Sequence, residues 1–357
     1  MKIVELRERT VSIASPMRNA SIGFGEMTAS AVAMVSDRGI TGYAFDSIGR
    51  YGKGALLRER FFPRLLGKEF IDPPACTREV MANEKPGGHG ERPGAVALIE
   101  AAAWDLHAKA QGVPLWRSIA DYYGRKGDAT IAAYASCGHF RTDDILTDEV
   151  KRAVDAGYRC VKVKVAGDVD QDLKRLERAA AALPPGAKWA VDLNGAEASE
   201  KWFDAMSPFG LAWIEEPAPP LDFDALRRLS GLGQPIATGE NLFSFDDARN
   251  LVRYGGLRPE RDFIQVDPLL AYGVDEYVRM LALWPAGRFL PHAGHLFNAH
   301  CVAALGLGMA EAAPDATLVY GGYWDGVRVD GGRVRIPDIP GAGYERKANL
   351  LAVLESV

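Results

Sequence analysis

Charged or titratable side chains end five successive apolar segments in the middle of the sequence. These residues are Asp192 in WAVDLN, Glu215 in LAWIEEP, Glu240 in PIATGEN, Asp267 in DFIQVDP and His292 in RFLPH. Three carboxylates that converge would repel one another and raise each other's pKa unless a cation joins them. Because all-oxygen ligands favour a hard ion, Asp192, Glu215 and Glu240 predict a Mg²⁺ site that water and substrate would complete.

Two lysines and the histidine could supply acid–base chemistry beside such an ion. In VKVKV, Lys162 and Lys164 alternate with valines, so a β-strand would place both ammonium groups on one face. A lysine near a divalent cation and a second lysine can have a lowered pKa and act as a base. Asp267 lies one strand before His292 and could hold its ring nitrogen, which makes His292 a candidate acid or base. The pattern predicts metal-assisted proton abstraction next to a carboxylate, with a base on each face.

The spacing of these residues predicts the fold that would bring them together. From Lys164 through the five positions to His292 the intervals are 28, 23, 25, 27 and 25 residues. Each interval is about one strand–helix unit of a fold in which about 250 residues close into eight units. The lysine pair alone would fit a solvated edge strand equally well. Six charged strand ends in register instead indicate the C-terminal edge of a parallel α/β barrel, where such folds build their active site.

The rest of the chain predicts a second domain around this repeating part. Lys2–Ala14 and Ala29–Ser36 have the pattern of strands, and the Gly-rich segment 15–28 between them is either an ordinary surface loop or a flap over the site. The strand–helix units are expected to begin with a strand at Ile131–Cys137 and to end with one at Ala316–Tyr320.

Three further polar residues are candidates for binding an anionic substrate. Arg50, in DSIGRYG, could clamp a carboxylate, although a solvated surface charge fits it as well. Lys85, in NEKPGGHGER, lies where Pro and Gly force an irregular loop that could hold a cation on a shaped backbone. Taken alone, that segment is a turn with incidental charges. Asn194 shares the strand face of Asp192 and could tune or supplement the metal site.

Composition excludes several classes of protein. With 357 residues, of which 48% are hydrophobic, the chain can bury enough apolar surface for two domains. A net charge of -5 without a long basic segment argues against a nucleic-acid partner. No stretch approaches ~18 uninterrupted apolar residues, so no membrane span is expected. The four cysteines are far apart, which predicts reduced thiols in a cytoplasmic protein rather than disulfides or zinc.

In this order the motifs VKVKV, VDLN, WIEEP, ATGEN, QVDP and LPH resemble the enolase superfamily, mandelate racemase subgroup, over essentially the whole chain. The resemblance implies a modified (β/α)7β TIM-type barrel at 126–320. It also implies an α+β capping domain formed by 1–125, to which the Gly-rich segment 321–357 returns. The ordered set of motifs is specific, so the α/β fold class is expected with this two-domain arrangement.

The same resemblance assigns roles to the candidate residues. It implies Mg²⁺ ligands and two acid–base groups at the positions that match the motifs: Asp192, Glu215 and Glu240 as ligands, Lys164 as the base, and Asp267 with His292 as a second acid–base dyad. Glu216 is not chosen as a ligand, because it alternates to the other face of its strand.

A narrower set of motifs, NEKPGGHGER, ATGENLFS, DARNLVRYGG and LPHAGH, resembles the D-tartrate dehydratases, a branch of this family. That resemblance implies that Lys85 contacts substrate and that Lys162 assists Lys164, which removes the proton α to a carboxylate before His292 expels the β-hydroxyl. The expected function is a Mg²⁺-dependent hydro-lyase that converts D-tartrate to oxaloacetate. The alternatives are a dehydratase of another acid sugar and a racemase or epimerase of a 2-hydroxy acid. A homo-oligomer is expected.

Overall fold

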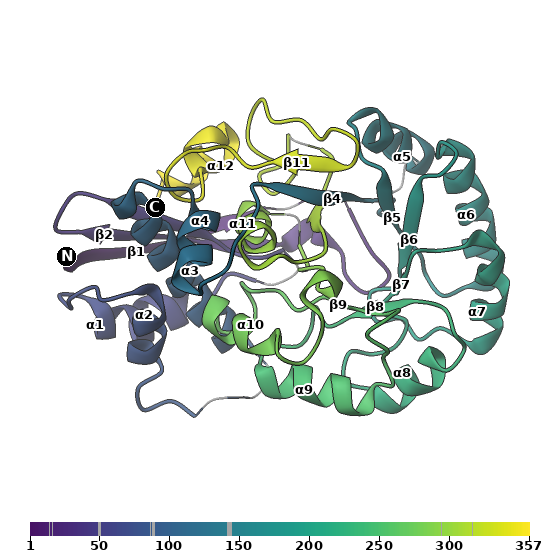
Figure 1. Cartoon of the computed structure of the whole chain (residues 1–357), viewed down its shortest axis with the longest axis horizontal. Helices are drawn as coiled ribbons and strands as arrows, with labels where there is room; N and C mark the ends of the chain where they lie inside the picture. Colours follow the sequence, from purple (N-terminus) through teal and green to yellow (C-terminus); the bar gives the residue numbers. More distant parts are fainter. Residues whose placement is uncertain are drawn as a thin grey trace.

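The computed structural model describes residues 1–13, 15, 17–48, 51–85, 87, 90–140, 145–293, 295–315 and 317–357. A three-stranded antiparallel sheet lies at one end of the molecule, and a curled parallel sheet surrounded by helices lies at the other (Figure 1). The predicted α/β class, with a barrel-type sheet and a separate capping sheet, is confirmed.

The N-terminal sheet has the order β1–β2–β3, with antiparallel pairing throughout. Its strands are β1 (Ile3–Ser12), β2 (Thr28–Ser36) and β3 (Thr41–Phe45). The helical elements that follow them are a π-helix η2 (Leu56–Phe61), α1 (Phe62–Leu65), α2 (Pro73–Val80), α3 (Arg92–Gln111) and α4 (Leu115–Tyr122). Helix α3 packs against β2 and β3, and it is buried along most of its length because it lies between this sheet and the barrel.

The parallel sheet has the order β10–β4–β5–β6–β7–β8–β9. Its strands are β4 (Thr130–Cys137), β5 (Cys160–Lys164), β6 (Lys188–Asp192), β7 (Ile214–Glu215), β8 (Ile236–Thr238), β9 (Phe263–Ile264) and β10 (Ala310–Ala312). Between β9 and β10, Leu290 N donates to Ile264 O at 2.9 Å and Gly308 N donates to Phe289 O at 2.9 Å. These bonds join the segment at Phe289–Leu290 to β9 on one side and to the residues just before β10 on the other, so the sheet continues to curl toward β10.

Helices cover the outside of the parallel sheet, as Figure 1 shows for α5 to α9. Their bounds are α5 (Leu146–Asp155), α6 (Val169–Ala182), α7 (Glu200–Met206), α8 (Phe223–Ser230), α9 (Phe245–Tyr254), α10 (Val274–Met280) and α11 (Leu296–Leu305). Short 3-10 turns occur at η1 (Phe24–Glu26), η3 (Ser207–Phe209), η4 (Ala286–Arg288) and η5 (Tyr344–Arg346). Inside the curled sheet, buried hydrophobic side chains fill the space: Tyr134, Cys160, Ala190, Trp213, Ala237 and Leu290.

The expected last strand at Ala316–Tyr320 is wrong, because the last parallel strand is β10 at Ala310–Ala312. Leu318 N donates to Asp315 O at 3.2 Å, and Gly321 N donates to Leu318 O at 3.0 Å, so the segment from Asp315 onward turns instead of pairing. The apolar letters of 318–320 suggested a strand, whereas a shorter segment with small residues on either side of Glu311 fits against β4.

The C-terminal segment contacts both parts of the molecule. Strand β11 (Arg333–Arg335) pairs antiparallel with β4, while helix α12 (Ala348–Leu354) packs on β2 and β3. Ala342 N also donates to Asp105 Oδ1 on α3 at 2.7 Å. We therefore propose the boundaries 1–125, 126–320 and 321–357, with the last segment belonging chiefly to the capping domain.

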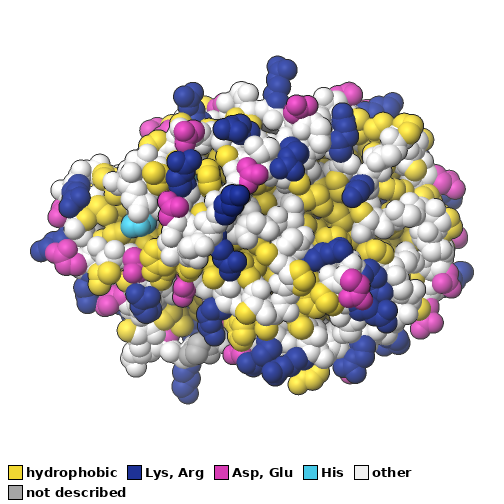
Figure 2. Space-filling view, in the orientation of Figure 1, with side chains coloured by type: hydrophobic (Ala, Val, Ile, Leu, Met, Phe, Trp, Pro, Cys, Tyr) yellow, Lys and Arg dark blue, Asp and Glu magenta, His cyan; other side chains and the backbone are white. Residues whose placement is uncertain are grey.

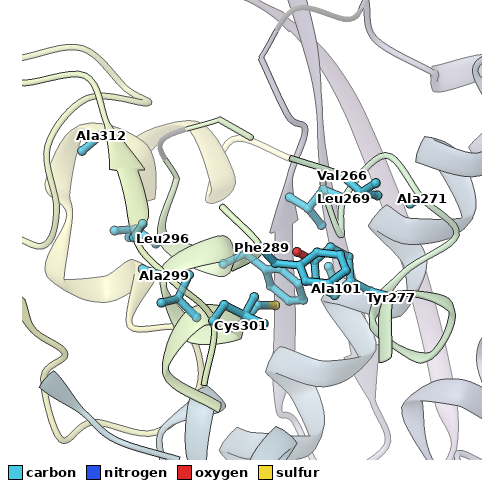
Figure 3. Packing of buried hydrophobic residues seen from close by; sticks show 14 of the residues in the cluster. Ala101, Val266, Leu269, Ala271, Tyr277, Phe289, Leu296, Ala299, Cys301 and Ala312 are labelled. Carbon is cyan, nitrogen blue, oxygen red and sulfur yellow. The ribbon is translucent and has the colours of Figure 1, made fainter. Parts of the chain in front are cut away.

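Apolar packing is continuous between the two parts. Figure 3 shows Ala101 of α3 packed near Tyr277 of α10, Phe289 and Cys301 of α11. All four cysteines are buried, and no two of them are joined by a disulfide in the structure. On the face shown in Figure 2, Lys and Arg side chains are interspersed with Asp and Glu. Within the described ranges, none of the helices combines the length and the apolar character that crossing a membrane would require.

A glycine at the contact between β3 and α3 provides a test of this packing. A Cβ atom at Gly42 would lie 2.2 Å from Ala102 O and 2.6 Å from Leu106 Cβ, whereas a Cβ at Gly25 would meet nothing within 4 Å. We expect Gly42→Ala to lower the free energy of unfolding by about 2 kcal/mol, because the helix must move away from the sheet. Gly25→Ala is the matched control and should change it by less than about 0.5 kcal/mol. Urea denaturation measures both, and equal stabilities of the two variants would contradict this packing.

Candidate active site

Three carboxylates lie together where neighbouring strands end. Asp192 ends β6, Glu215 ends β7 and Glu240 follows β8, and one oxygen from each lies within 4.8 Å of the others. Strand register produces this grouping, since Asp192 is directly opposite Glu215. All three side chains are buried. An all-oxygen donor set of this size fits a hard divalent cation such as Mg²⁺.

The two predicted lysines lie beside the acids on strand β5. Lys164 is in register with Asp192, and its Nζ donates to Asp192 Oδ2. Lys162 Nζ donates to Glu215 Oε1 and lies 3.3 Å from Asp192 Oδ2. Both ammonium groups are buried. The lysines therefore neutralise part of the negative charge that three clustered carboxylates carry.

The pKa values follow from this arrangement. Burial disfavours the charged carboxylate of Asp192, but Lys164 and Lys162 outweigh burial and hold its pKa below the usual range. Burial and then the charge of Asp192 raise the pKa of Glu215 to about 8. The mutual repulsion that we expected between converging carboxylates therefore raises the pKa of Glu215. At Asp192 the positive charges of the two lysines outweigh this repulsion.

The lowered pKa predicted for Lys164 depended on a divalent cation beside it and stays a prediction, while the neighbouring carboxylates by themselves act in the opposite direction. Burial acts to lower the pKa of Lys164, but the charge of Asp192 outweighs it and raises the pKa above its usual value. The pKa of Lys162 is raised well above its usual value in the same way, against burial, by Glu215 and Glu311. The sequence argument assumed a cation beside the lysines, and without it the carboxylates stabilise the charged ammonium groups.

Sequence reasoning missed Glu311, a buried acid on β10. Its Oε1 lies 3.1 Å from Lys162 Nζ, and its Oε2 accepts a hydrogen bond from Tyr134 OH at 2.9 Å. The ring of Tyr134 also lies under the ammonium group, with 5.7 Å between Lys162 Nζ and the ring centroid. Burial opposes ionisation of Glu311, yet Lys162 lowers its pKa to about 2. The sequence did contain a signal for this residue, because Glu311 is the one polar residue of the short strand Ala310–Ala312. It was missed because the last strand was predicted further along the chain, at Ala316–Tyr320.

His292 lies on the opposite flank of the acid cluster from Lys164. Its Nδ1 is 3.3 Å from Asp267 Oδ2, and its Nε2 is 3.6 Å from Glu240 Oε2. Asn298 Nδ2 donates to the His292 carbonyl oxygen and, at 3.1 Å, to Asp267 Oδ1. Burial favours the neutral ring, but Glu240 and Asp267 outweigh burial and raise the pKa of His292 to about 9. The predicted contact of Asp267 with His292 is present.

Two neighbours of the predicted ligands have distinct positions. Asn194 N donates to Asp192 Oδ1 at 2.8 Å and its Nδ2 lies 3.3 Å from Asp192 Oδ2, so Asn194 holds that carboxylate in place. Glu216 turns away with a φ of 42°, and its Oε1 accepts a hydrogen bond from Asn241 at 2.8 Å. Burial, followed by the charges of Glu240 and Asp192, raises the pKa of Glu216 well above its usual range.

Of the two predicted substrate-binding cations of the N-terminal loops, Lys85 is not brought into this cluster. Lys85 is exposed and makes no hydrogen bond or ion pair with the residues that the structure describes. The neighbouring Gly87 does lie near the barrel, with its carbonyl oxygen 3.5 Å from Tyr272 OH. Arg50 lies outside the described residues. Their roles therefore stay predictions.

The described part of the segment between β1 and β2 contacts the barrel. Arg18 and Phe140 exchange backbone hydrogen bonds of 3.0 and 2.8 Å, which join the segment to the loop after β4. Ser21 Oγ donates to the backbone oxygen of Asn194 at 2.5 Å, beside the acid cluster. Phe24 contacts the His139 ring edge-on, with 6.2 Å between ring centroids.

A cavity of about 890 Å³ lies between this segment and the barrel. Its lining includes Ser136 of β4 and residues of helix α5, while the clustered carboxylates and the two lysines are not among the residues that line it. His139 also lines the cavity, and burial, followed by the charge of Lys164, lowers the pKa of His139 to about 3.

Comparison with known proteins gives a consistent result. The family model described as enolase C-terminal domain-like matches residues 146–349. An o-succinylbenzoate synthase of Geobacillus kaustophilus is 32% identical over 268 residues, which is 70% of this chain and 67% of that protein. An L-talarate/galactarate dehydratase of Salmonella typhimurium is 27% identical over 318 residues, or 84% of this chain and 78% of that protein.

A solved structure shares the fold at lower identity. The crystal structure of L-talarate dehydratase from Polaromonas sp. JS666, complexed with Mg and L-glucarate, has a TM-score of 0.78 and 23% sequence identity. The match covers 96% of this chain and 94% of that chain.

The raised pKa of His292 predicts a pH-dependent contribution to stability in chelator-treated protein. The folded value of about 9 exceeds the usual 6.5, so the charged ring stabilises the fold below about pH 6.5 and this contribution is lost as the pH rises through 9. We expect the difference in unfolding free energy between wild type and His292→Gln to shrink by about 3 kcal/mol from pH 6.5 to pH 10.

The matched control is His300→Gln. Burial lowers the pKa of His300 to about 4, so this ring stays neutral over the whole pH range. The stability difference for His300→Gln should change by less than about 0.5 kcal/mol. Urea denaturation at the two pH values measures both, and a pH-independent difference for His292→Gln would contradict the prediction.

Proposed function

This chain belongs to the enolase C-terminal domain-like family, and we propose that it is a Mg²⁺-dependent dehydratase of a hydroxy diacid, with D-tartrate as the substrate and oxaloacetate as the product. The observation that supports this most is the placement of two acid–base groups on opposite flanks of one acid cluster. Lys164 contacts Asp192 on one side, and His292 lies 3.6 Å from Glu240 on the other. A carboxylate substrate bound at the cluster would lie between them.

Asp192, Glu215 and Glu240 would hold the Mg²⁺ ion. The bound ion would offset the negative charge that develops on the substrate carboxylate as its α-proton leaves. Carboxylates engaged by a divalent cation stabilise a neighbouring ammonium group less, so the pKa of Lys164 would fall toward the range of a useful base. Lys162 stays held by Glu311, because that acid lies outside the three-carboxylate set.

The elimination can be written with the residues of this chain. Lys164 Nζ, in its neutral form, accepts the proton from the carbon next to one carboxylate. The C–O bond at the β-carbon then breaks, and the protonated His292 ring donates a proton to the departing hydroxyl, which leaves as water. Tartrate thereby loses one water molecule to give the enol of oxaloacetate, which tautomerises to the keto acid. Asp267 keeps the His292 ring oriented.

The other predicted substrate contacts complete the proposal. Asn194 and Lys162 already lie at the cluster, where they could donate to substrate oxygens. Lys85 and Arg50 would bind the second carboxylate of a diacid. The similarity to a protein named L-talarate/galactarate dehydratase supports dehydration of an acid sugar, and the D-tartrate motifs favour the shorter diacid.

Metal binding can be tested without turnover. We expect Mg²⁺ to bind the wild-type protein in isothermal titration calorimetry, and Glu240→Gln to weaken binding at least about tenfold because one charged ligand is lost. Glu197→Gln removes an exposed acid whose ion-pair partner is Arg228, so it is the matched control and should bind like wild type. Equal affinity of wild type and Glu240→Gln would rule out this metal site.

The reaction itself can be followed as keto-acid formation. With Mg²⁺ and D-tartrate, wild type should form oxaloacetate, and Lys164→Ala should lower the rate at least about 10³-fold while still binding Mg²⁺, because the base is missing. Turnover by Lys164→Ala near the wild-type rate would exclude Lys164 as the base. Oxaloacetate formation in the presence of excess chelator would contradict the metal-dependent proposal.

The same assay distinguishes the alternatives. If D-tartrate gives no product while galactarate or L-talarate gives a keto acid, the enzyme is a dehydratase of a longer acid sugar. If a 2-hydroxy acid incorporates solvent deuterium at its α-carbon with inversion and without loss of water, it is a racemase or epimerase. A racemase or epimerase is the second candidate because Lys164 and His292 lie on opposite flanks of the acid cluster, where each could exchange a proton with one face of the substrate.

A further inference from the structure

A serine from the N-terminal sheet contacts the proposed acid–base dyad of the barrel. Ser47 lies two residues beyond the end of β3 and is fully buried, with 0% relative exposure. Its Oγ donates to Asp267 Oδ2 at 2.5 Å. The two residues are 220 positions apart in the chain, so this bond crosses between the capping part and the barrel.

The same carboxylate oxygen faces the ring of His292. Nδ1 of His292 lies 3.3 Å from Asp267 Oδ2, so Ser47 and His292 share one acceptor atom. The other oxygen, Oδ1, accepts from Leu269 N at 2.8 Å and Asn298 Nδ2 at 3.1 Å. Each oxygen of this buried carboxylate therefore has two partners, and Ser47 is the partner that the barrel itself does not supply.

Ser47 is held in place by a buried ion pair behind it. Ser47 N donates to Asp46 Oδ1 at 3.0 Å, and Lys53 Nζ lies 2.7 Å from both oxygens of Asp46. All three side chains are buried. Gly94 of α3 leaves the space for this pair, since a Cβ there would lie 2.6 Å from Lys53 Cε. A hydroxyl fixed in this way has little freedom to bond elsewhere.

We propose that Ser47 is a positioning residue that holds the Asp267 carboxylate, and through it the His292 ring, in the orientation facing the acid cluster. The proposal rests on the proposed function for the role of the dyad, but its geometric content does not require a particular substrate. Without the hydroxyl, Oδ2 keeps only the histidine as a partner, and the carboxylate can rotate toward the ring. The barrel site is then complete only when the capping part contributes Ser47.

The first test is independent of turnover. In the ¹H NMR spectrum of chelator-treated protein at pH 7, the ring Nδ1–H of His292 is identified as the downfield signal that is lost in His292→Gln. We expect Ser47→Ala to move this signal downfield, because Asp267 Oδ2 becomes a stronger acceptor for the ring when the serine stops donating. Ser47→Thr keeps the hydroxyl and should leave it at the wild-type position.

Ser36→Ala is the matched control, because Ser36 is also a buried serine of the N-terminal sheet and its hydroxyl exchanges hydrogen bonds with the backbone of Ile40. Its effect on the His292 signal should be absent. If Ser47→Ala does not fold, Ser47→Cys replaces it as a near-isosteric variant with a weak donor. The proposal would be overturned if the His292 signal stayed at its wild-type position in folded Ser47→Ala, or in Ser47→Cys where that variant replaces it. An equal shift of the signal in Ser36→Ala would also overturn it.

The second test uses D-tartrate with Mg²⁺. We expect Ser47→Ala to lower kcat about tenfold with KM within about twofold of wild type, because a misplaced acid affects the chemical step more than binding. In protein that already carries Asp267→Asn, adding Ser47→Ala should lower kcat no further. If the two substitutions lowered kcat by the product of their separate effects, the proposal would be overturned. If wild type does not turn over D-tartrate, the substrate assignment fails while the NMR comparison still decides the role of Ser47.

Discussion

Buried negative charge at the mouth of the barrel is the constraint on which the rest of this structure depends. Asp192, Glu215 and Glu240 have oxygens within 4.8 Å of one another, and Glu216 and Glu311 are buried nearby. Buried carboxylates at this density are stable only if cations or donors compensate them. The chain supplies Lys162 and Lys164 from one strand, so two ammonium groups meet the acids without any long loop.

These lysines stabilise the fold and also constrain the chemistry. A base must be able to lose its proton, yet the carboxylate of Asp192 raises the pKa of Lys164 and favours its charged form. The same electrostatics keeps His292 protonated, with Glu240 and Asp267 raising its pKa to about 9 against burial. In the proposed reaction, His292 would therefore donate a proton, and Lys164 would accept one once a cation engages the acids.

The N-terminal part of the chain contributes directly to the site as well as covering it. Ser21 reaches the backbone of Asn194, and Ser47 reaches the carboxylate of Asp267. These contacts come from opposite ends of the β2–β3 region and meet the barrel at two different strand ends. The cavity beside helix α5 is also lined by residues of both parts, among them Met17 and Ser136.

The sequence by itself determined the α/β class, the order of the strands from β4 to β9, and the identity of the clustered acids and of the lysines and histidine beside them. It could do so because side chains alternate along a strand and every parallel strand ends at the same edge, so period and spacing alone place these residues together. Only the tertiary structure decided the position of β10, the contacts of Glu311, the charge state of Lys164 and the contact of Ser47 with Asp267. Those features depend on distances between residues far apart in the chain, and on the balance of burial against neighbouring charge, which no local pattern records.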